Sequence, residues 1–365
     1  MPREPIVVVG AGIIGASIAY HLAKRGAQVT IVEASRPASE ASGKSFGWIN
    51  ATFSKRPRHY FDLNIHAVAD WHRLHEELNG EPAIQWGGSV TWCVPGADAA
   101  DLAQGIRNHR QWGYAVREID AAELHRLLPN VAPGDFQKAC FCESEGAVDP
   151  VEAVNVLLNF AQRSSAEIRC PSTVTGLEIA NGQVRGVRTE AGSIRAGTLV
   201  LACGVAIPGI AQMASLQVPL KDAPGVLVHT AQLPKLIDRV AIAPGVHFKQ
   251  TADGRIVVGG QIVAGAGTSV SDANINQASE IFEQARRFLP ALHDARIDHV
   301  TLGHRVMPED EYPILGFSAP CPNLYLAATH SGVTLAPLIG RLAAIEILDG
   351  TPVSLLEPYR PSRFS

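Results

Sequence analysis

The first thirty-three residues carry the pattern that most restricts how this chain can fold. A short β-branched run at 6–9 leads directly into residues 10–15 (GAGIIG), which have the spacing GxGxxG. Residues 13–24 then place apolar side chains at helical spacing, and a second apolar run at 29–32 ends at Glu33. This order predicts a strand, a glycine turn, a helix and a second parallel strand, which is the unit that binds dinucleotides.

Each glycine of this motif has a physical role in holding a pyrophosphate. Gly10 permits the tight turn, Gly12 lets the backbone approach the phosphates, and Gly15 lets the helix pack closely on the strand. Free N–H groups at the start of the helix add positive potential for the phosphates. Glu33 can accept hydrogen bonds from ribose hydroxyls, and its charge disfavours a 2′-phosphate, so NADP is not expected. A glycine turn without a ligand is the less favoured alternative.

Composition places the chain among ordinary globular enzymes and excludes some partners. Of 365 residues, 46% are hydrophobic and 18% charged, and the net charge is -4, so nucleic acid is not an expected partner. No apolar run approaches the roughly 20 residues that span a bilayer. The N-terminal apolar stretch is interrupted by glycines and reads as a strand rather than a signal peptide, which favours a cytoplasmic location. We interpret the six scattered cysteines as reduced thiols and expect no metal site.

Helix and strand patterns alternate along the remaining chain. Residues 35–60, rich in small and polar side chains, predict a long irregular functional loop. Asn181-Gly182 predicts a tight hairpin. We expect helices near 62–78, 98–113, 151–163, 272–289 and 334–348, and strands at 89–94, 174–179, 184–189, 192–196, 198–202, 255–258 and 324–327.

These interleaved signals predict an α/β (α+β) fold with two domains. The first is a Rossmann-like dinucleotide-binding domain made of discontinuous segments, 1–80, 146–215 and 300–365. The second is an inserted, mostly antiparallel β-sheet domain for the substrate, built from 81–145 and 216–299.

Four later segments distinguish FAD from NAD as the dinucleotide. They are residues 42–47 (SGKSFG), the strand-rich stretch 173–204, residues 303–305 (GHR), and residues 329–334 (THSGVT) before a helix. Together with the glycine motif they resemble the D-amino-acid oxidase, glycine oxidase and sarcosine oxidase superfamily of FAD-dependent flavoproteins. The resemblance spans most of the chain.

This resemblance implies a path for FAD along the chain. Glu33 holds the adenosine ribose, Ser42 lies along the pyrophosphate and ribityl chain, and Val174 contacts the adenine through its backbone. The turn from His330 to Thr334 lies at the pyrimidine edge of the flavin, where the positive end of the following helix would favour the reduced anion. The residues predicted to bind FAD are Gly10, Gly12, Ile13, Ile14, Gly15, Glu33, Ala34, Ser42, Gly43, Lys44, Ser45, Phe46, Gly47, Val174, Ala202, Gly204, Arg305, Ser331, Gly332, Val333 and Thr334.

The attachment of the flavin can also be anticipated. Some members of the superfamily attach it covalently through His or Cys. This chain has Ser42, and Ser318 or Ala319, near the positions that resemble those attachment points. Non-covalent FAD is therefore predicted.

The resemblance assigns substrate binding to Arg305. Residues 303–310, followed by Pro313, resemble the superfamily segment in which an arginine clamps a substrate carboxylate, although the residue after Arg305 is substituted. The planar guanidinium matches a carboxylate bidentately. The alternative is a structural arginine paired with Glu309 or Asp310.

Two histidines are candidates for catalytic roles. His330 could accept a proton or orient the substrate beside the flavin, or it could be a structural histidine in the turn. His247 and its neighbour Phe248 lie where members often carry aromatic or histidine side chains that face the substrate. Their alternative is packing within the core of a strand.

Other candidates carry less specific signals. Trp48 could cover the flavin ring and contact substrate or belong to the core, and His304 could join Arg305 at the substrate or face away. Lys44 and Lys249 are candidates for a cation that promotes reaction with oxygen, or they are solvated or phosphate-facing lysines. Gln261 is a further pocket candidate.

The implied reaction is oxidation of a C–N bond in an amine or amino acid of the glycine, D-amino-acid or N-alkyl amino-acid type. Hydride passes to flavin N5 and the imine hydrolyses, with oxygen, a quinone or another carrier as electron acceptor. One alternative is an FAD-dependent 2-hydroxy-acid dehydrogenase, which needs a strong general base. Another is a flavin-binding subunit of a larger oxidoreductase complex. An oligomer is compatible with either.

Overall fold

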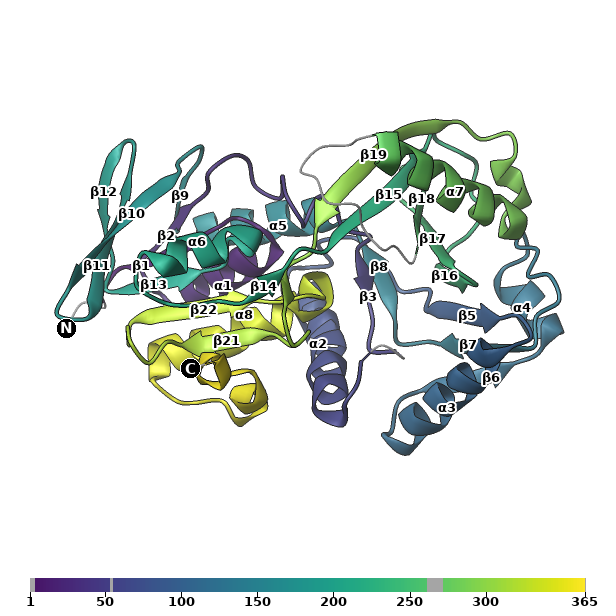
Figure 1. Ribbon diagram of the computed structural model, residues 1–365, viewed down its shortest axis with the longest axis horizontal. Coiled ribbons are helices and arrows are strands. Elements are labelled where there is room, and N and C mark those ends of the chain that lie inside the picture. Colours follow the sequence, from purple (N-terminus) through teal and green to yellow (C-terminus); the bar gives the residue numbers. More distant parts are fainter. Residues whose placement is uncertain (1–3, 53–54, 261–271, 365) are drawn as a thin grey trace.

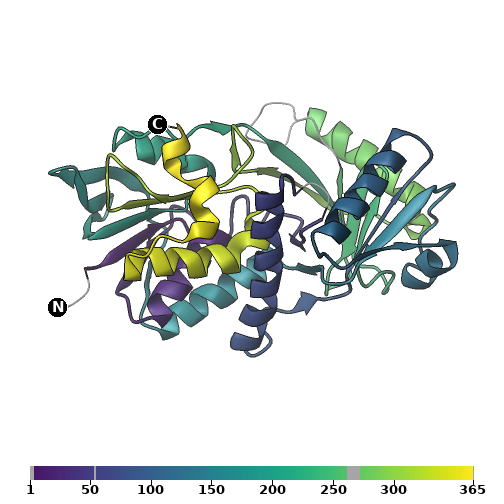
Figure 2. The same ribbon diagram turned by 90° about the horizontal axis from the view of Figure 1, so that it is seen from below.

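Two large sheets lie side by side, each with its own helices (Figure 1). The computed structural model describes residues 4–52, 55–260 and 272–364. The fold is mixed α/β, as predicted. Helix α2 (Arg58–Glu77) runs between the two halves, which is clearest in Figure 2. None of the helices in these described ranges is long and apolar enough to span a membrane.

The six-stranded sheet is parallel except for one edge strand, and its central strand is apolar on both faces. In β1 (Ile6–Val9), Ile6 and Val8 pack against the helices, while Val7 and Val9 pack against a small antiparallel sheet on the other side. Covering both faces explains why the strand is a continuous apolar run. The strand order is β21 (Ile314–Phe317), β22 (Leu324–Ala328), β13 (Thr198–Leu201), β1, β2 (Val29–Val32) and β9 (Glu167–Arg169).

Helices α1 (Ile13–Lys24), α5 (Pro150–Arg163) and α8 (Gly332–Asp349) cover one face of this sheet. The other face carries the small sheet and α6 (Ile207–Gln212). Asn181 and Gly182 have φ of 53° and 69°, which confirms the predicted tight hairpin turn. The strands of the small sheet are β10 (Val174–Ala180), β11 (Gln183–Thr189) and β12 (Gly192–Arg195).

The eight-stranded sheet is antiparallel except where β16 pairs with β5. Helix α7 (Asp272–Phe288) packs on one of its faces. Its last strand, β19, continues through His304, beyond the segment border predicted at 299/300, and so leads directly to Arg305. The strand order is β19 (Ile297–His304), β15 (Pro224–Thr230), β18 (Ile256–Gly260), β17 (Val246–Gln250), β16 (Val240–Ala243), β5 (Ser89–Cys93), β7 (Lys138–Cys142) and β6 (Val116–Ile119).

Two helices cover the β6 end of this sheet (Figure 1). The sequence pattern predicted a helix at α3 (Ala97–Gln111) but none at α4 (Ala121–Leu127). The short α4 carries a start signal in Asp120, whose Oδ1 accepts a hydrogen bond from Glu123 N at 2.8 Å.

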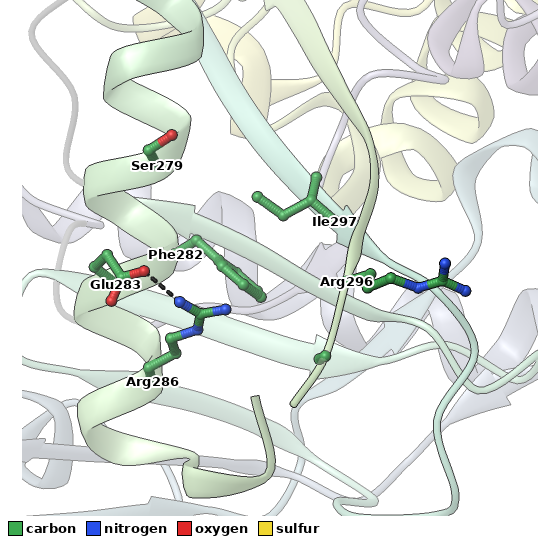
Figure 3. Close-up of a pocket in the computed structure, with 7 residues that line it drawn as sticks. Ser279, Phe282, Glu283, Arg286, Arg296 and Ile297 are labelled. Carbon is green, nitrogen blue, oxygen red and sulfur yellow. Dashed lines mark hydrogen bonds and ion pairs between the residues drawn. The ribbon is translucent and has the colours of Figure 1, made fainter. Parts of the chain in front are cut away.

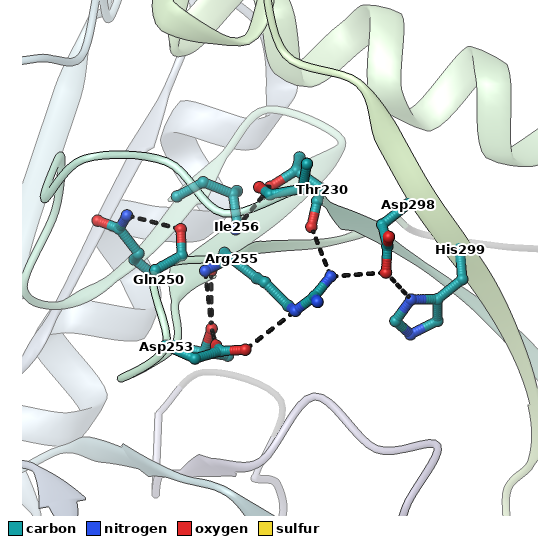
Figure 4. A network of polar contacts seen from close by, with 10 residues as sticks. Thr230, Gln250, Asp253, Arg255, Ile256, Asp298 and His299 are labelled. Carbon is teal, nitrogen blue, oxygen red and sulfur yellow. Dashed lines mark hydrogen bonds and ion pairs between the residues drawn. The ribbon is translucent and has the colours of Figure 1, made fainter.

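Polar side chains, among them the buried Gln250, hold the end of the eight-stranded sheet where β15 ends and β18 begins (Figure 4). The amide of Gln250 is 3% exposed and bonds only backbone: its Oε1 accepts from Leu236 N at 2.7 Å and its Nε2 donates to Pro234 O at 2.8 Å. Arg255 donates to Asp298 Oδ2 at 2.6 Å and to Asp253 Oδ2 at 2.9 Å. The Gln250 bonds satisfy loop backbone that would otherwise be buried without partners.

Short strands join the two halves, and they correct one prediction. Residues 35–60 were expected to be irregular throughout, but β3 (Trp48–Ile49) and the start of α2 at Arg58 lie within them. β3 pairs with β8 (Gly146–Val148), a partner almost 100 positions away that local pattern could not reveal. The other short strands are β4 (Ile84–Gln85), which also pairs with β8, and β14 (Leu220–Lys221), which pairs with β20 (Met307–Pro308).

Candidate active site

The glycine turn after β1 has the close packing that its sequence predicts. Gly10 has φ of +104°, and a Cβ there would lie 2.6 Å from Ala202 O. A Cβ on Gly15 would lie 2.0 Å from Gly10 O, so the helix rests directly on the turn. A Cβ on Gly12 would lie 3.1 Å from Ser42 Oγ. The absence of a side chain at Gly12 therefore leaves room at the N-terminus of the helix that follows.

Glu33 stands at the carboxyl end of β2, beside this turn. Its Oε2 accepts from Ala11 N at 2.8 Å and its Oε1 accepts from Ser35 N at 2.9 Å, so the backbone fixes the carboxylate. The neighbouring Ala34 is exposed. A carboxylate oxygen has further lone pairs, so Glu33 can still accept bonds from a ribose.

The loop 42–47 folds over the start of α1. Ser42 Oγ accepts a hydrogen bond from Ile13 N at 2.9 Å, and a Cβ on Gly43 would lie 2.3 Å from Ala38 O. Lys44 forms an ion pair with Glu40 at 2.9 Å, the arrangement of a solvated lysine. Ser45 Oγ accepts a hydrogen bond from Gly47 N at 3.4 Å, and Gly47 O accepts one from Val148 N at 2.9 Å. Phe46 contacts His247 of the eight-stranded sheet.

The start of α8 lies against the start of α1. A Cβ on Gly332 would lie 3.6 Å from a side-chain carbon of Ile14, and Ser331, which precedes the helix, has φ of 58°. Pro337 has no N–H for the carbonyl of Val333, and Trp71 Nε1 donates to that carbonyl at 2.9 Å instead. The buried indole therefore fixes the first turn of α8.

Two helix N-termini thus converge at the carboxyl ends of the parallel strands. Neither α1 nor α8 has a side-chain cap or an acidic residue in its first turn, so both present uncompensated positive potential. Ala202 and Gly204 follow β13 at the same edge, and Val174 begins β10. This arrangement fits the pyrophosphate and the electron-rich pyrimidine edge of FAD. The residues of the described ranges contain no cluster of three metal-binding side chains.

Arg305 presents a free edge of its guanidinium. Its Nε donates to Ala223 O at 3.1 Å and its Nη2 to Pro224 O at 3.3 Å, so one edge is fixed by backbone. The alternative pairing with Asp310 is wrong, because Asp310 forms an ion pair with Arg363 at 2.7 Å. Within the described residues no carboxylate pairs with Arg305. Three N–H groups remain, enough for a bidentate carboxylate.

His304, the last residue of β19, turns toward Asp222. Its Nδ1 lies 3.0 Å from Asp222 Oδ1, while its Nε2 is buried and has no partner among the described residues. The ring is therefore held on one side, and its other nitrogen keeps an unused capacity for a hydrogen bond.

Partly buried His330 lies where several candidates meet. Its Nδ1 lies 3.2 Å from Ser331 Oγ, and Ser331 also bonds Tyr60 and Lys55. Burial, then the charges of Lys55 and Arg305, lowers the pKa of His330 to about 3. The imidazole is therefore neutral at neutral pH and can accept a hydrogen bond.

Strand β17 sends alternate side chains to opposite faces of its sheet. His247 packs edge-on against Phe46, with ring centroids 4.5 Å apart, and burial lowers its pKa to about 4. Buried Lys249 lies 5.4 Å from the same ring, donates to Val148 O at 3.0 Å, and has a pKa lowered to about 8 by burial. Lys249 is therefore not the solvated lysine of the alternative interpretation.

Phe248 needs a correction. Its side chain is 0% exposed and packs with Trp92 and Val90 in the core of the substrate half, on the face opposite His247. The predicted contact with substrate is not supported, because neighbouring strand residues point to opposite faces.

A buried carboxylate that the sequence analysis missed orients Trp48. Glu145 Oε2 accepts from Trp48 Nε1 at 3.1 Å and Ser89 Oγ at 2.6 Å. Its Oε1 accepts from Ala51 N at 3.0 Å and Tyr114 OH at 2.8 Å. Thr334 Oγ1 donates to Trp48 O at 3.0 Å, so the start of α8 and Glu145 hold the same strand.

The positions named for covalent attachment also need correction. Ser318 follows β21 and bonds Cys321 in the turn before β22, and Ala319 is in the same turn. That turn precedes β22, at the edge opposite the glycine turn. Near the glycine turn, burial raises the pKa of the Cys203 thiol to about 12, so the thiol is a poor nucleophile. Non-covalent FAD stays a prediction: acid precipitation should release the colour, and a coloured pellet would contradict it.

One open groove lies elsewhere. It has a volume of about 450 Å³ between α7 and β19, and it is lined by Phe282, Arg286 and Ile297 among others (Figure 3). Ile297 begins β19 and His304 ends it, so the groove is at the opposite end of the strand from Arg305. Gln261, the remaining pocket candidate, lies outside the described residues.

A dinucleotide turn, two converging helix N-termini and an arginine with a free guanidinium edge are features of a flavin-dependent oxidoreductase. The chain belongs to the FAD dependent oxidoreductase family (DAO), whose model matches residues 5–345. It is 25% identical to glycine oxidase of Bacillus licheniformis, over 99% of this chain and 98% of that protein. Hydrogen cyanide synthase subunit HcnC of Pseudomonas aeruginosa is 24% identical, over 98% and 96%. The crystal structure of L-proline dehydrogenase from P. horikoshii shares the fold, with a TM-score of 0.90 and 24% identity over 100% and 98%.

The chain is therefore an FAD-dependent enzyme that acts on C–N bonds, and its relatives act on small amines or amino acids. Lys55, Tyr60 and Glu145 were not singled out by the sequence analysis. Lys55 follows the glycine-rich loop and Glu145 precedes β8, but neither belongs to a motif. Only the contacts made by the folded chain identify them.

Proposed function

We propose that this enzyme oxidises the C–N bond next to the carboxylate of an amino acid or an N-substituted amino acid. The observation that carries the proposal is Arg305, whose free guanidinium edge lies close enough to His330 for its charge to act on the imidazole. Bound FAD supplies the oxidising chemistry, removing two electrons and a proton from the substrate C–H beside nitrogen. Water then hydrolyses the imine.

The residues of this chain have separate tasks in that reaction. Arg305 binds the carboxylate and so fixes the carbon that reacts. Neutral His330 accepts a hydrogen bond from the amine, which must lose its charge before oxidation. His247 and Trp48 exclude water from the flavin side of the site. Lys249 is the better candidate of the two lysines for promoting reaction with oxygen, because it is buried.

An anaerobic titration tests the proposal. Glycine, D-amino acids, N-methyl amino acids, cyclic imino acids and hydroxy acids are added to the holoenzyme while flavin absorbance is recorded. We expect an amino acid to bleach the flavin, and Arg305→Met to weaken its binding about 100-fold or more with FAD retained. Arg126→Met is the control, since Arg126 is exposed and pairs with Glu123 at 2.7 Å. Unchanged kinetics in Arg305→Met would refute the role.

Two alternatives are separated by the same titration. A 2-hydroxy-acid dehydrogenase would need His330 or His247 as a strong general base, and the low pKa values of both imidazoles disfavour it. In that case hydroxy acids would bleach the flavin, and His330→Gln or His247→Gln would nearly abolish turnover, whereas amine oxidation should tolerate either change better. A flavin-binding subunit without its own site would respond to no amine; one relative, HcnC, is named as a subunit of hydrogen cyanide synthase.

A further inference from the structure

Lys55 is a buried cation without an acidic partner. The residue is 5% exposed, its Nζ donates to Ser331 Oγ, and it lies 5.5 Å from the centre of the Tyr60 ring. In the ranges that the structure describes, no carboxylate forms an ion pair with it. Burying an ammonium group without a counter-ion is costly, so an anion from outside the chain is expected to complete this environment.

Two acidic side chains, one on α2 and one after β20, are engaged by other cations. Asp62, on the first turns of α2, forms an ion pair with Arg58 at 2.7 Å. Asp310, after β20, is held by Arg363 at 2.7 Å. Neither carboxylate is therefore available to neutralise Lys55.

Uncharged groups complete the surroundings of Lys55. Tyr60 OH donates to Ser331 Oγ at 3.2 Å, and the Tyr60 ring packs edge-on against Tyr312, with centroids 5.5 Å apart. Tyr312 OH donates to Arg56 O at 3.3 Å. Hydroxyl groups and the positive edges of aromatic rings can surround a bound carboxylate without repelling it.

Lys55 and Arg305 act on the same imidazole. Lys55 reaches Ser331, whose hydroxyl lies 3.2 Å from His330 Nδ1. Arg305 presents its free edge from the end of β19, and both positive charges contribute to the low pKa of His330, after burial. Two cations from different halves of the molecule therefore place positive charge near the same imidazole.

We propose that Lys55 binds a second acidic group of the substrate, which makes the substrate an amine with two carboxylates. Arg305 takes the carboxylate next to the reacting carbon, and Lys55 takes the other. The amine nitrogen then lies near His330. This inference rests on the proposed function, because it assigns a substrate class to the same site.

Two ligands that differ by one carboxylate test the proposal. Thiodiacetate and (methylthio)acetate carry sulfur in place of the amine nitrogen, so they bind without undergoing C–N oxidation. Their dissociation constants for the holoenzyme follow from the change in flavin absorbance and from calorimetry. We expect thiodiacetate to bind at least about 10-fold more tightly, since a hydrogen bond to a charged group contributes at least that much.

Variants assign the difference to Lys55. Lys55→Met should weaken thiodiacetate binding by about 10- to 100-fold and leave (methylthio)acetate unchanged, while Lys55→Arg should keep most of the preference. Lys138→Met is the control, since Lys138 is paired with Glu118 at 2.7 Å on the β6–β7 surface. If Lys55→Met does not fold, Lys55→Gln is measured in its place.

The outcomes separate this inference from the proposed function. Equal binding of the two ligands, or an equal loss of both in Lys55→Met, overturns the second carboxylate site. A changed spectrum of the ligand-free flavin together with unchanged ligand preference also overturns it, because Lys55 would then serve the cofactor. If Arg305→Met fails to weaken either ligand, the proposed function fails, whatever Lys55 does.

Discussion

The two large sheets present chemistry to the site in different ways. The parallel sheet offers backbone: the turn at Gly10, the start of α1 and the start of α8 meet at the carboxyl ends of its strands. The antiparallel sheet offers side chains, with His247 and Lys249 on one face of β17 and Arg305 after β19. A backbone site requires a fixed local conformation, whereas a side-chain site requires only the correct face and register.

This difference explains where each half tolerates change. In the parallel half, an added methyl group meets main-chain atoms that cannot move away. In the antiparallel half, a side chain that faces the site can be replaced without such a clash with the main chain. The contacts that stability depends on there are the hydrogen bonds that hold the loops at the other end of the sheet. Variants in the two halves should therefore differ in whether they disturb main-chain packing or the contacts of single side chains.

The largest effect is expected from Gly15→Ala. Its Cβ would lie 2.0 Å from Gly10 O, so helix and turn must separate. We expect loss of FAD binding and a decrease of about 2 to 4 kcal/mol in the free energy of unfolding, measured by flavin fluorescence and urea denaturation. Gly209→Ala is the matched control, because nothing lies within 4 Å of its added Cβ. Normal FAD content in Gly15→Ala would show that the backbone site is adaptable.

Gln250→Leu probes the antiparallel half without touching the flavin side. The change removes the acceptor of Leu236 N and Ile237 N and the donor to Pro234 O in a buried position. We expect the free energy of unfolding to fall by about 2 to 4 kcal/mol in urea, with FAD still bound by the folded protein. The exposed Gln232→Leu serves as the control. Loss of FAD at full stability would mean that the two halves are not separable in this way.

The smallest effect concerns pH and His247. Burial lowers its pKa from 6.5 to about 4, so between these values the unfolded chain binds a proton that the folded chain does not. The stability of the wild type therefore falls as the pH decreases from 6.5 to 4. His247→Gln should flatten this part of the curve of urea midpoint against pH. An unchanged slope would mean that His247 is protonated in the folded protein.

Much of the parallel half could be predicted from sequence because its signals are local. The helix Ile13–Lys24 and the strands Ile6–Val9 and Val29–Val32 lie where the apolar pattern placed them. Phe248 shows the limit in the other half. The pattern of β17 alternates in any register, and sequence alone does not tell which face meets the flavin side.

The sequence by itself determined the dinucleotide turn, the acidic residue after β2 and the candidate arginine, since each depends on a few neighbouring residues. The tertiary structure decided which charges are compensated. Asp310 follows Arg305 closely in sequence but pairs with Arg363. Lys55 bonds Ser331, 276 positions away, and no carboxylate of the described residues pairs with it. Such pairings depend on how distant segments pack, because the cost of a buried charge is set by the neighbours that the fold supplies.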